Sequence, residues 1–150
     1  MDKKIAIVSG GFDPIHIGHI RLFKEAKELA DELLVIINND NWLIKKKGYT
    51  FMPENDRIEI ISSLRYVDKI LLTSHKQNPV DMSICNELKQ LHNLNNKASN
   101  LIFCNGGDRK ADNILEYKLC LELGIDMKFN IGGSKVRSSS ELAEKAKVID

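Results

Sequence analysis

Two uninterrupted apolar runs, at residues 5–8 and 33–37, constrain the fold of this chain more than any other feature. A strand with one solvated face alternates apolar and polar residues, whereas a parallel strand that is covered on both faces is apolar throughout. Residues 19–31, which lie between the two runs, repeat apolar side chains at helical spacing. This part of the chain therefore predicts a strand, a helix and a second strand parallel to the first.

The same alternation continues to the end of the chain. Pro53 suits the first position of a helix that we expect to run to residue 67. The further elements are expected in the order strand 69–73, helix 79–94, strand 101–104, helix 113–123, strand 125–129 and a last helix from Ser138. Residues 38–48 and the asparagine-rich residues 92–100 are predicted to be loops. We predict one α/β domain over residues 1–150, Rossmann-like, with a five-stranded parallel sheet and helices on both of its faces.

Composition limits the classes of function. The chain has 150 residues, of which 43% are hydrophobic, so it can bury a core without disulfides or metal ions. Because 22 basic and 21 acidic residues leave a net charge of +1, no overall field attracts nucleic acid or an anionic membrane. The cysteines, at positions 85, 104 and 120, show no CxxC spacing, which is typical of a reduced compartment. With neither a signal peptide nor a long apolar span in the sequence, we expect a cytoplasmic enzyme without a membrane or nucleic-acid partner.

The most informative segment, residues 9–19, follows the first strand and opens the first helix. Ligands of open parallel sheets bind beyond the carboxyl ends of the strands, where the strand order reverses. Gly10 and Gly11 let the backbone approach a ligand, and a helix N-terminus attracts anions. His16 and His19 are one helical turn apart, so both rings can converge on one phosphate. The segment matches neither GxGxxG nor GxxxxGK[ST], which disfavours hydride transfer and P-loop hydrolysis.

The Gly-Gly-Phe-Asp sequence followed by His-x-Gly-His resembles the signature of a nucleotidyltransferase superfamily that includes cytidylyltransferases and nicotinamide-mononucleotide adenylyltransferases. The resemblance implies that His16 and His19 touch a nucleoside triphosphate and stabilise the charge that develops in the transition state. It also implies that the nucleotide packs against the start of the helix. The nucleotide-binding residues expected here are Gly10, Gly11, Phe12, Asp13 and Gly18, and Asp13 is in addition a candidate for orienting substrate or metal.

Three consecutive lysines, at residues 45–47, follow the second strand. In isolation such a run is a solvated face. Glycerol-phosphate cytidylyltransferases and heptose-phosphate adenylyltransferases, which this chain resembles, carry lysines here that clamp phosphate, so the resemblance implies a catalytic role for Lys46 and leaves the other two lysines unresolved. It further implies that Arg57 reaches the triphosphate or the acceptor substrate. Asp40 and Trp42 are candidates for shaping the acceptor pocket, and packing in the fold is the alternative role for the tryptophan.

Two later motifs carry the same resemblance. Residues 64–68 are similar to the family's RYVD stretch, in which Arg65 suits a ligand contact and a structural ion pair equally. The Gly-Gly-Asp-Arg sequence after the fourth predicted strand is similar to that of heptose-phosphate adenylyltransferases. This similarity implies that Gly106 and Asp108 contact the ribose or base and that Arg109 meets phosphate.

Three serines precede the last predicted helix. Ser138 begins a Ser-x-x-Glu capping box, and hydroxyl and N–H groups at a helix start also bind phosphate. The resemblance implies that Ser139 is catalytic and that Ser138 and Ser140 bind the nucleotide. Lys135 and Arg137 are further candidates for phosphate contact.

Taken together, the motifs imply an enzyme that transfers a nucleoside monophosphate from a nucleoside triphosphate (NTP) to a phosphorylated sugar or polyol and releases pyrophosphate. AMP from ATP is slightly favoured over CMP from CTP. Mg²⁺ is the expected cofactor, held mainly by phosphates and water, and a homodimer is the expectation from the family. A CTP-dependent glycerol-3-phosphate-type enzyme and a non-catalytic nucleotide-binding regulatory protein stay open. The near-neutral charge disfavours an RNA-binding fragment related to class I aminoacyl-tRNA synthetases.

Overall fold

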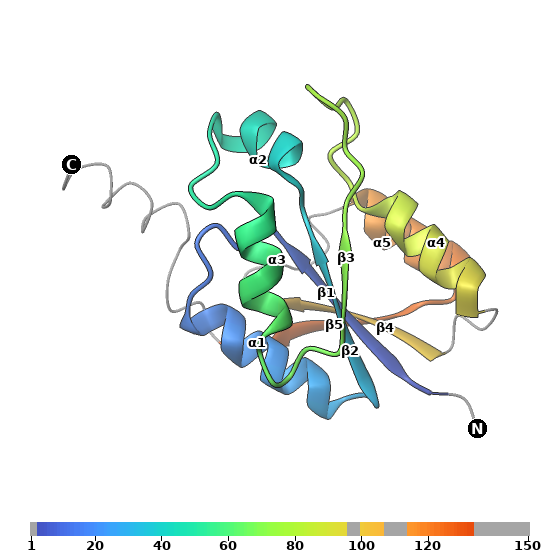
Figure 1. Ribbon diagram of the computed structural model, residues 1–150. Helices are drawn as coiled ribbons and strands as arrows, with labels where there is room; N and C mark the ends of the chain where they lie inside the picture. Colours follow the sequence, from blue (N-terminus) through green and yellow to red (C-terminus); the bar gives the residue numbers. More distant parts are fainter. Residues whose placement is uncertain (1–2, 96–99, 107–113, 134–150) are drawn as a thin grey trace.

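The computed structural model describes residues 3–95, 100–106 and 114–133. Their strands form one five-stranded parallel sheet in the spatial order β3-β2-β1-β4-β5 (Figure 1). The strands are β1 (Ile5–Gly10), β2 (Glu32–Ile37), β3 (Lys69–Leu72), β4 (Leu101–Gly106) and β5 (Asp126–Ile131). The predicted α/β, Rossmann-like architecture is confirmed.

Helices cover both faces of the sheet. They are α1 (Ile17–Glu28), α2 (Asp40–Lys47), α3 (Glu54–Ser62), α4 (Cys85–Asn95) and α5 (Ile114–Leu123). Helices α1 and α3 lie on one face, α4 and α5 lie on the other, and α2 lies beyond the carboxyl edge of the sheet (Figure 1). Within the described ranges, no helix combines the length and the apolar character needed to cross a membrane.

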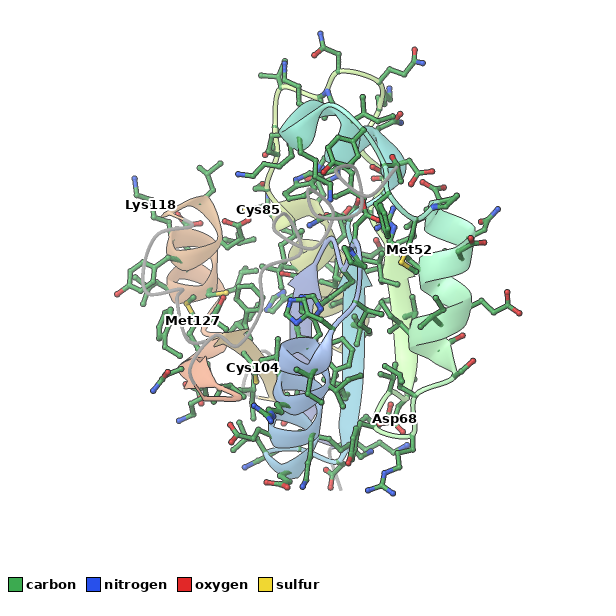
Figure 2. The ribbon with its side chains drawn as sticks, turned by 90° about the vertical axis from the view of Figure 1, so that its left-hand side faces the viewer. Met52, Asp68, Cys85, Cys104, Lys118 and Met127 are labelled. Carbon is green, nitrogen blue, oxygen red and sulfur yellow. The ribbon has the colours of Figure 1, made fainter. Side chains whose placement is uncertain are left out.

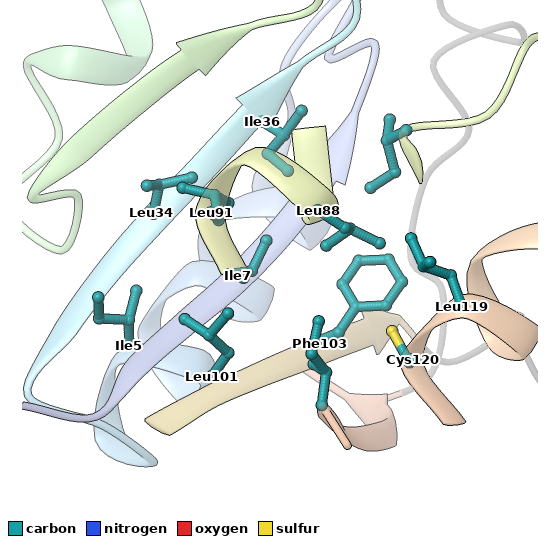
Figure 3. Packing of buried hydrophobic residues seen from close by; sticks show 12 residues of the cluster. Ile5, Ile7, Leu34, Ile36, Leu88, Leu91, Leu101, Phe103, Leu119 and Cys120 are labelled. Carbon is teal, nitrogen blue, oxygen red and sulfur yellow. The ribbon is translucent and has the colours of Figure 1, made fainter. Parts of the chain in front are cut away.

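The strands divide their side chains between two buried layers. Ile7 and Phe103 belong to the layer beneath α4 and α5 (Figure 3), whereas Val8 packs with Phe23 of α1 in the layer on the opposite face. Every residue from 33 to 37 is buried, because successive side chains of a covered strand all meet apolar neighbours. This two-sided burial explains the uninterrupted apolar runs of the sequence.

The site-forming edge of the sheet is set by the order of the strands. β1 is the central strand and pairs with β2 on one side and with β4 on the other. The chain proceeds outward from β1 through β2 to β3 and then returns to the opposite side of β1, so the order reverses between β1 and β4. These two strands end at Gly10 and Gly106. Their carboxyl ends therefore form the crevice where open parallel sheets bind ligands.

The prediction of a loop over residues 38–48 is wrong, because Asp40–Lys47 form helix α2. The side-chain oxygen of Asn39 caps this helix by accepting a hydrogen bond from the Trp42 N–H at 3.0 Å. An acid in the first turn and three lysines in the last turn suit the helix dipole. Gly48 ends the helix in a left-handed conformation, with φ at 87°. All of these signals are present in the sequence, but the helix is too short to show a clear apolar period.

Two other helix boundaries also differ from the predictions. Helix α3 ends at Ser62, well before residue 67, and Pro53 precedes it as the N-cap. Helix α4 begins at Cys85 and not at residue 79. The Ser83 N–H donates to the Asp81 carboxylate at 2.8 Å, and this local bond holds the segment before α4 in a turn.

Candidate active site

His16 and His19 stand at the start of α1, directly beyond the end of β1. His16 is the N-cap of the helix, and its Nδ1 accepts a hydrogen bond from the Gly18 N–H at 3.1 Å. The Nδ1 of His19 accepts in turn from the His16 N–H, also at 3.1 Å. Such a reciprocal capping box is usually made by Ser or Thr with Glu or Gln. Here two imidazoles make it.

These two bonds determine which ring nitrogen carries the proton. A ring nitrogen that accepts from a backbone N–H is unprotonated, so each neutral imidazole carries its proton on Nε2. The rings of His16 and His19 stack, with centroids 3.8 Å apart and 26° between their planes. The structure thus brings the two histidines together as the sequence predicts, with an N–H donor on each ring.

Phe12 supports this histidine pair from the core. Its side chain is 3% exposed and packs edge-on against His19, with ring centroids 4.9 Å apart, and against Phe23 at 5.3 Å. The predicted contact of Phe12 with a nucleotide stays a prediction, and the packing gives the residue a structural role as well. At Gly18, an added Cβ would lie 3.0 Å from Cε1 of His16. A side chain at position 18 would therefore displace the His16 ring.

The glycine pair at the end of β1, Gly10 and Gly11, packs closely against other parts of the protein. A Cβ at Gly10 would lie 3.0 Å from Cζ of Phe12, and a Cβ at Gly11 would lie 2.8 Å from Cδ2 of Leu43. These approaches bring the loop against α2 and against the aromatic ring beneath the histidines. Their predicted closeness to a nucleotide stays a prediction.

Asp13 joins this loop to the segment between α2 and α3. Its carboxylate is 1% exposed and accepts from the N–H groups of Phe51 and Met52. Lys47 forms an ion pair with it at 3.0 Å and donates to the Asp13 carbonyl oxygen at 2.8 Å. Both carboxylate oxygens thus have protein partners, which gives Asp13 a role in shaping the loop.

Arg57 lies at the centre of the same region, fully buried. Its guanidinium donates to the carbonyl oxygens of Met52 at 2.9 Å, of Gly11 at 2.8 Å and of Asn38 at 2.6 Å. It also forms an ion pair with Asp40 at 2.8 Å. The structure brings Arg57 and Asp40 together as a pair that ties the ends of β1 and β2 to α3. Since the Arg57 side chain is 0% exposed, it holds the site together from within.

The loop after β3 is fastened to α2. The Trp42 indole N–H donates to the Met82 carbonyl oxygen at 2.8 Å, and the Asn39 amide donates to the His75 carbonyl oxygen at 2.8 Å. The His75 ring lies half-buried between the Thr73 hydroxyl and the Ser83 carbonyl oxygen. In the sequence, His75 has no partner at ligand spacing, which indicates an ordinary surface residue. The structure adds that the ring links the two ends of this loop.

The three lysines of α2 have different surroundings. Lys47 reaches Asp13, whereas Lys45 donates to the side-chain oxygen of Asn78 in the loop after β3 at 2.8 Å. Lys46 is exposed. Of the three, the structure places Lys47 nearest the loop that carries the histidines, and the phosphate-binding role of Lys46 stays a prediction.

The RYVD segment lies away from this site. Asp68 accepts from the Leu33 N–H at 2.8 Å and pairs with Lys27 at 2.6 Å. Figure 2 shows Asp68 at the opposite end of the sheet from Met52, which contacts Asp13. Arg65 is exposed and stacks on the neighbouring Tyr66 ring. In this structure the segment contributes to the fold.

Gly106 ends β4 beside the crevice, and a Cβ built there would meet none of the described residues within 4 Å. The predicted nucleotide contact of Gly106 stays a prediction. The remaining predicted site residues lie outside the described residues: Asp108, Arg109, Lys135, Arg137, Ser138, Ser139 and Ser140.

The family model described as cytidylyltransferase-like matches residues 7–123, which is most of the chain. The chain belongs to the cytidylyltransferase-like family. Its sequence is 41% identical over 90 residues to a FAD synthase of Pyrococcus horikoshii, covering 59% of this chain and 60% of that protein. It is 31% identical over 124 residues to the bifunctional protein HldE of Desulfatibacillum aliphaticivorans, covering 81% of this chain and 23% of that protein. The chain thus spans at most about three-fifths of the length of these relatives.

A solved structure shows the same fold as this chain. The crystal structure of a lipopolysaccharide core biosynthesis protein from Thermoplasma volcanium superposes with a TM-score of 0.65 at 26% identity, over 90% of this chain and 99% of that one. The likeness extends across nearly the whole of both chains, so it shows the same arrangement of strands and helices around the site.

Sequence reasoning missed part of what holds this family site together. It left Lys47 unresolved, although that residue reaches Asp13, and it did not anticipate that Asn39 would fasten α2 to the loop after β3. For Asn39 a signal was available, because an asparagine before a short run that ends in glycine suits an N-cap. For Lys47 the sequence offers no such signal, because the three adjacent lysines differ only in the direction in which the helix points each side chain.

Proposed function

We propose that this protein is a nucleotidyltransferase, which moves the nucleoside monophosphate of an NTP onto a phosphorylated small molecule and releases pyrophosphate. The observation that carries the proposal is the reciprocal hydrogen bonding of His16 and His19, which holds two imidazole N–H donors together at a helix N-terminus. Such a donor pair suits a triphosphate. Membership of the cytidylyltransferase-like family supports the same chemistry.

The reaction needs no general base. An oxygen of the ionised acceptor phosphate donates an electron pair to the α-phosphorus of the NTP and forms a new P–O bond. The bond from that phosphorus to the oxygen that bridges to the β-phosphate breaks. Pyrophosphate leaves with the electron pair of the broken bond. Negative charge then concentrates on the transferring and departing oxygens. His16 and His19 would donate hydrogen bonds to these oxygens. Lys46 and Ser139 are the further residues that we propose for phosphate binding.

Mg²⁺ is the proposed companion of the triphosphate and would screen its charge. Among the described residues, no cluster of three or more His, Cys, Asp or Glu side chains could hold a metal ion, and the Asp13 oxygens have protein partners. The ion would therefore be held by phosphate oxygens and water, which is a common arrangement for magnesium. The chain would contribute the groups that position the triphosphate.

The relatives support ATP as the nucleotide and narrow the acceptor. FAD consists of AMP joined to FMN, so the name FAD synthase points to ATP and FMN as substrates of that relative. The heptose-phosphate adenylyltransferase associated with HldE pairs ATP with a sugar phosphate. FMN carries its phosphate on a ribityl chain, which is itself a polyol. We therefore propose an acceptor that is a phosphate ester on a hydroxylated carbon chain.

The test is pyrophosphate release from purified protein with Mg²⁺, each of the four NTPs, and FMN, glycerol 3-phosphate or a heptose phosphate as acceptor. We expect release with ATP and one acceptor, and no release from the His16→Ala/His19→Ala variant. Release with CTP and glycerol 3-phosphate would favour the cytidylyltransferase alternative. Binding of NTP in calorimetry without release from any pair would favour a regulatory protein. Absence of NTP binding would contradict the proposal.

A further inference from the structure

Two buried side-chain oxygens at the carboxyl edge of the sheet have no hydrogen-bond partner among the described residues. They are Oδ1 of Asn38, which follows β2 and is 4% exposed, and Oδ1 of Asn105 in β4, which is 2% exposed. Buried carbonyl oxygens nearly always accept a hydrogen bond, so each exception needs an explanation. Neither carboxamide belongs to the histidine site described above.

Both asparagines belong to the face of the sheet that α4 and α5 cover. In β2, Ile36 faces that layer, and Asn38 is the next residue of the same alternating series. In β4, Phe103 faces the same layer, and Asn105 is the next residue on that side of the strand. Figure 3 shows Ile36 and Phe103 packed in this layer. The two carboxamides therefore lie on the same face as this apolar layer, at its end beside the carboxyl edge of the sheet.

The end of β1 lies between them. Because β2 and β4 are both neighbours of β1, their axes are about 10 Å apart. The register of β1 against β4 ends with Ile7 opposite Phe103, and Asn105 lies two residues further along β4. The next residues along β1 are Gly10 and the loop that leads to the histidines. A molecule in the crevice beside β1 would thus have one of the two asparagines on each side.

The first turns of α4 and α5, the helices that cover this face of the sheet, carry two buried carboxylates. Glu87, in the first turn of α4, is 4% exposed and accepts from the Ser74 N–H. Glu116, in the first turn of α5, is 9% exposed and accepts from the Ile84 N–H at 3.2 Å. On the α1 side of the same edge, His16, His19 and Lys47 are donors. A phosphate suits the α1 side, whereas groups that donate hydrogen bonds suit the α4/α5 side.

We propose that Asn38 and Asn105 accept hydrogen bonds from hydroxyl groups of the acceptor substrate and so select a polyol or sugar phosphate over a phosphate ester without hydroxyls. The inference rests on the proposed function, since it assigns the part of the acceptor that is remote from its phosphate. No hydrogen bond among the described residues fixes either Oδ1, and the amide of Asn105 is 3.5 Å from the Lys128 carbonyl oxygen. Each Oδ1 therefore keeps its capacity to accept a hydrogen bond from a ligand.

The test compares two ligands of equal chain length by calorimetry: ribitol 5-phosphate, which carries hydroxyls, and pentyl phosphate, which does not. We expect the wild-type protein to bind ribitol 5-phosphate about tenfold more tightly, or better. The variants Asn38→Leu and Asn105→Leu keep the size of the side chain and remove the carboxamide. Each should lose most of this preference and leave the affinity for pentyl phosphate within about twofold of wild type. Equal binding of the two ligands by the wild-type protein overturns the inference.

Two further variants guard against an indirect effect of leucine. Asn105→Asp keeps accepting oxygens and should keep the preference for ribitol 5-phosphate. Asn55→Leu, at an exposed position of α3, should leave both affinities unchanged. In the absence of ligand, the thermal midpoints of Asn38→Leu and Asn105→Leu should equal or exceed that of wild type, because leucine replaces an unpartnered oxygen. A lowered midpoint for both would show that the oxygens serve the fold, and would overturn the inference.

Pyrophosphate release with the same two ligands separates this inference from the proposed function. Equal turnover of pentyl phosphate and ribitol 5-phosphate would support the nucleotidyltransferase and overturn hydroxyl selection. A binding preference that depends on both asparagines, without turnover by any NTP, would support the selection and contradict the enzyme activity. The same measurements with FMN and with a heptose phosphate then show which hydroxylated acceptor loses most affinity when Asn38 or Asn105 is replaced.

Discussion

The imidazole of His16 caps the helical turn that presents His19, and the imidazole of His19 accepts the backbone N–H of His16. The same two side chains therefore stabilise the start of α1 and supply the proposed phosphate-binding donors. The two roles can be separated by mutation, because the capping bonds use Nδ1 and the proposed phosphate contacts use Nε2.

Replacement of His16 by Asn should keep the cap and remove the ring donor, since Asn is among the best N-cap residues. We expect His16→Asn to retain the wild-type thermal midpoint and to release pyrophosphate about 100-fold more slowly. His16→Ala should lose the activity and also about 1 kcal/mol of stability. The measurements are thermal unfolding and pyrophosphate release. A His16→Asn protein with the wild-type rate would contradict the proposed role of the ring.

Lys47 and Lys46 provide a matched pair of substitutions. Lys47→Met leaves the Asp13 carboxylate, 1% exposed, without its cation, and should lower the free energy of unfolding in urea by about 2–4 kcal/mol. Lys46→Met should change that free energy by less than about 0.5 kcal/mol, because Lys46 is exposed. If Lys46 binds phosphate, its variant should show a higher KM for the NTP at unchanged stability. Equal stabilities of the two variants would show that the Lys47 ion pair contributes little.

Arg57 and Arg65 form a second such pair. Arg57→Met removes a buried cation and leaves the Asp40 carboxylate and three carbonyl oxygens unpaired, so we expect a loss of about 3–5 kcal/mol. For Arg65→Met, at an exposed position, the expected loss is below about 0.5 kcal/mol. Urea titrations followed by circular dichroism measure both. A small loss at Arg57 would mean that the loops keep their arrangement without it.

Two glycines predict opposite outcomes for the same substitution. Gly132 has φ at 86°, and an added Cβ would lie 2.9 Å from backbone atoms of Leu22 in α1, so Gly132→Ala should lower the thermal midpoint clearly. The Cβ of Gly106→Ala meets no atom of the part of the chain that the structure describes within 4 Å, and the substitution should leave the midpoint unchanged. An increase in the KM for ATP in Gly106→Ala alone would then report a nucleotide packed against this residue. An unchanged KM would remove Gly106 from the nucleotide-binding residues.

The buried cysteines predict a loss of stability in alkaline solution. Burial in apolar surroundings raises the pKa of Cys104 and of Cys120 to about 12 each, because it disfavours the thiolate. The unfolded chain loses these protons near pH 9.0, the ordinary pKa of a cysteine thiol. Their contribution to stability is thus complete below pH 9 and declines as the pH rises toward 12. Urea unfolding at about pH 8, 9 and 10.5 should show the decline, and a Cys104→Ala/Cys120→Ala variant should show a smaller one.

The sequence was sufficient to predict the parallel sheet, because burial on both faces leaves a direct mark on strands such as residues 33–37. It was sufficient for the convergence of His16 and His19, because one helical turn fixes their separation. The roles of Arg57 and Lys47 could not be predicted from the sequence, because their partners Gly11 and Asp13 are distant from them along the chain. Short helices such as α2 were missed because caps, and not apolar periodicity, define them.

The four bonds of Arg57 have a consequence for the order in which this protein can open. They connect the loop after β1, the end of β2 and the start of α2 to α3, across as many as 46 positions of the chain. None of these segments can detach alone without stranding a guanidinium in the interior, so their amides should exchange with solvent as one cooperative unit. A ligand that rests on the loop after β1 would thereby slow hydrogen exchange in α3, which Arg57 joins to that loop.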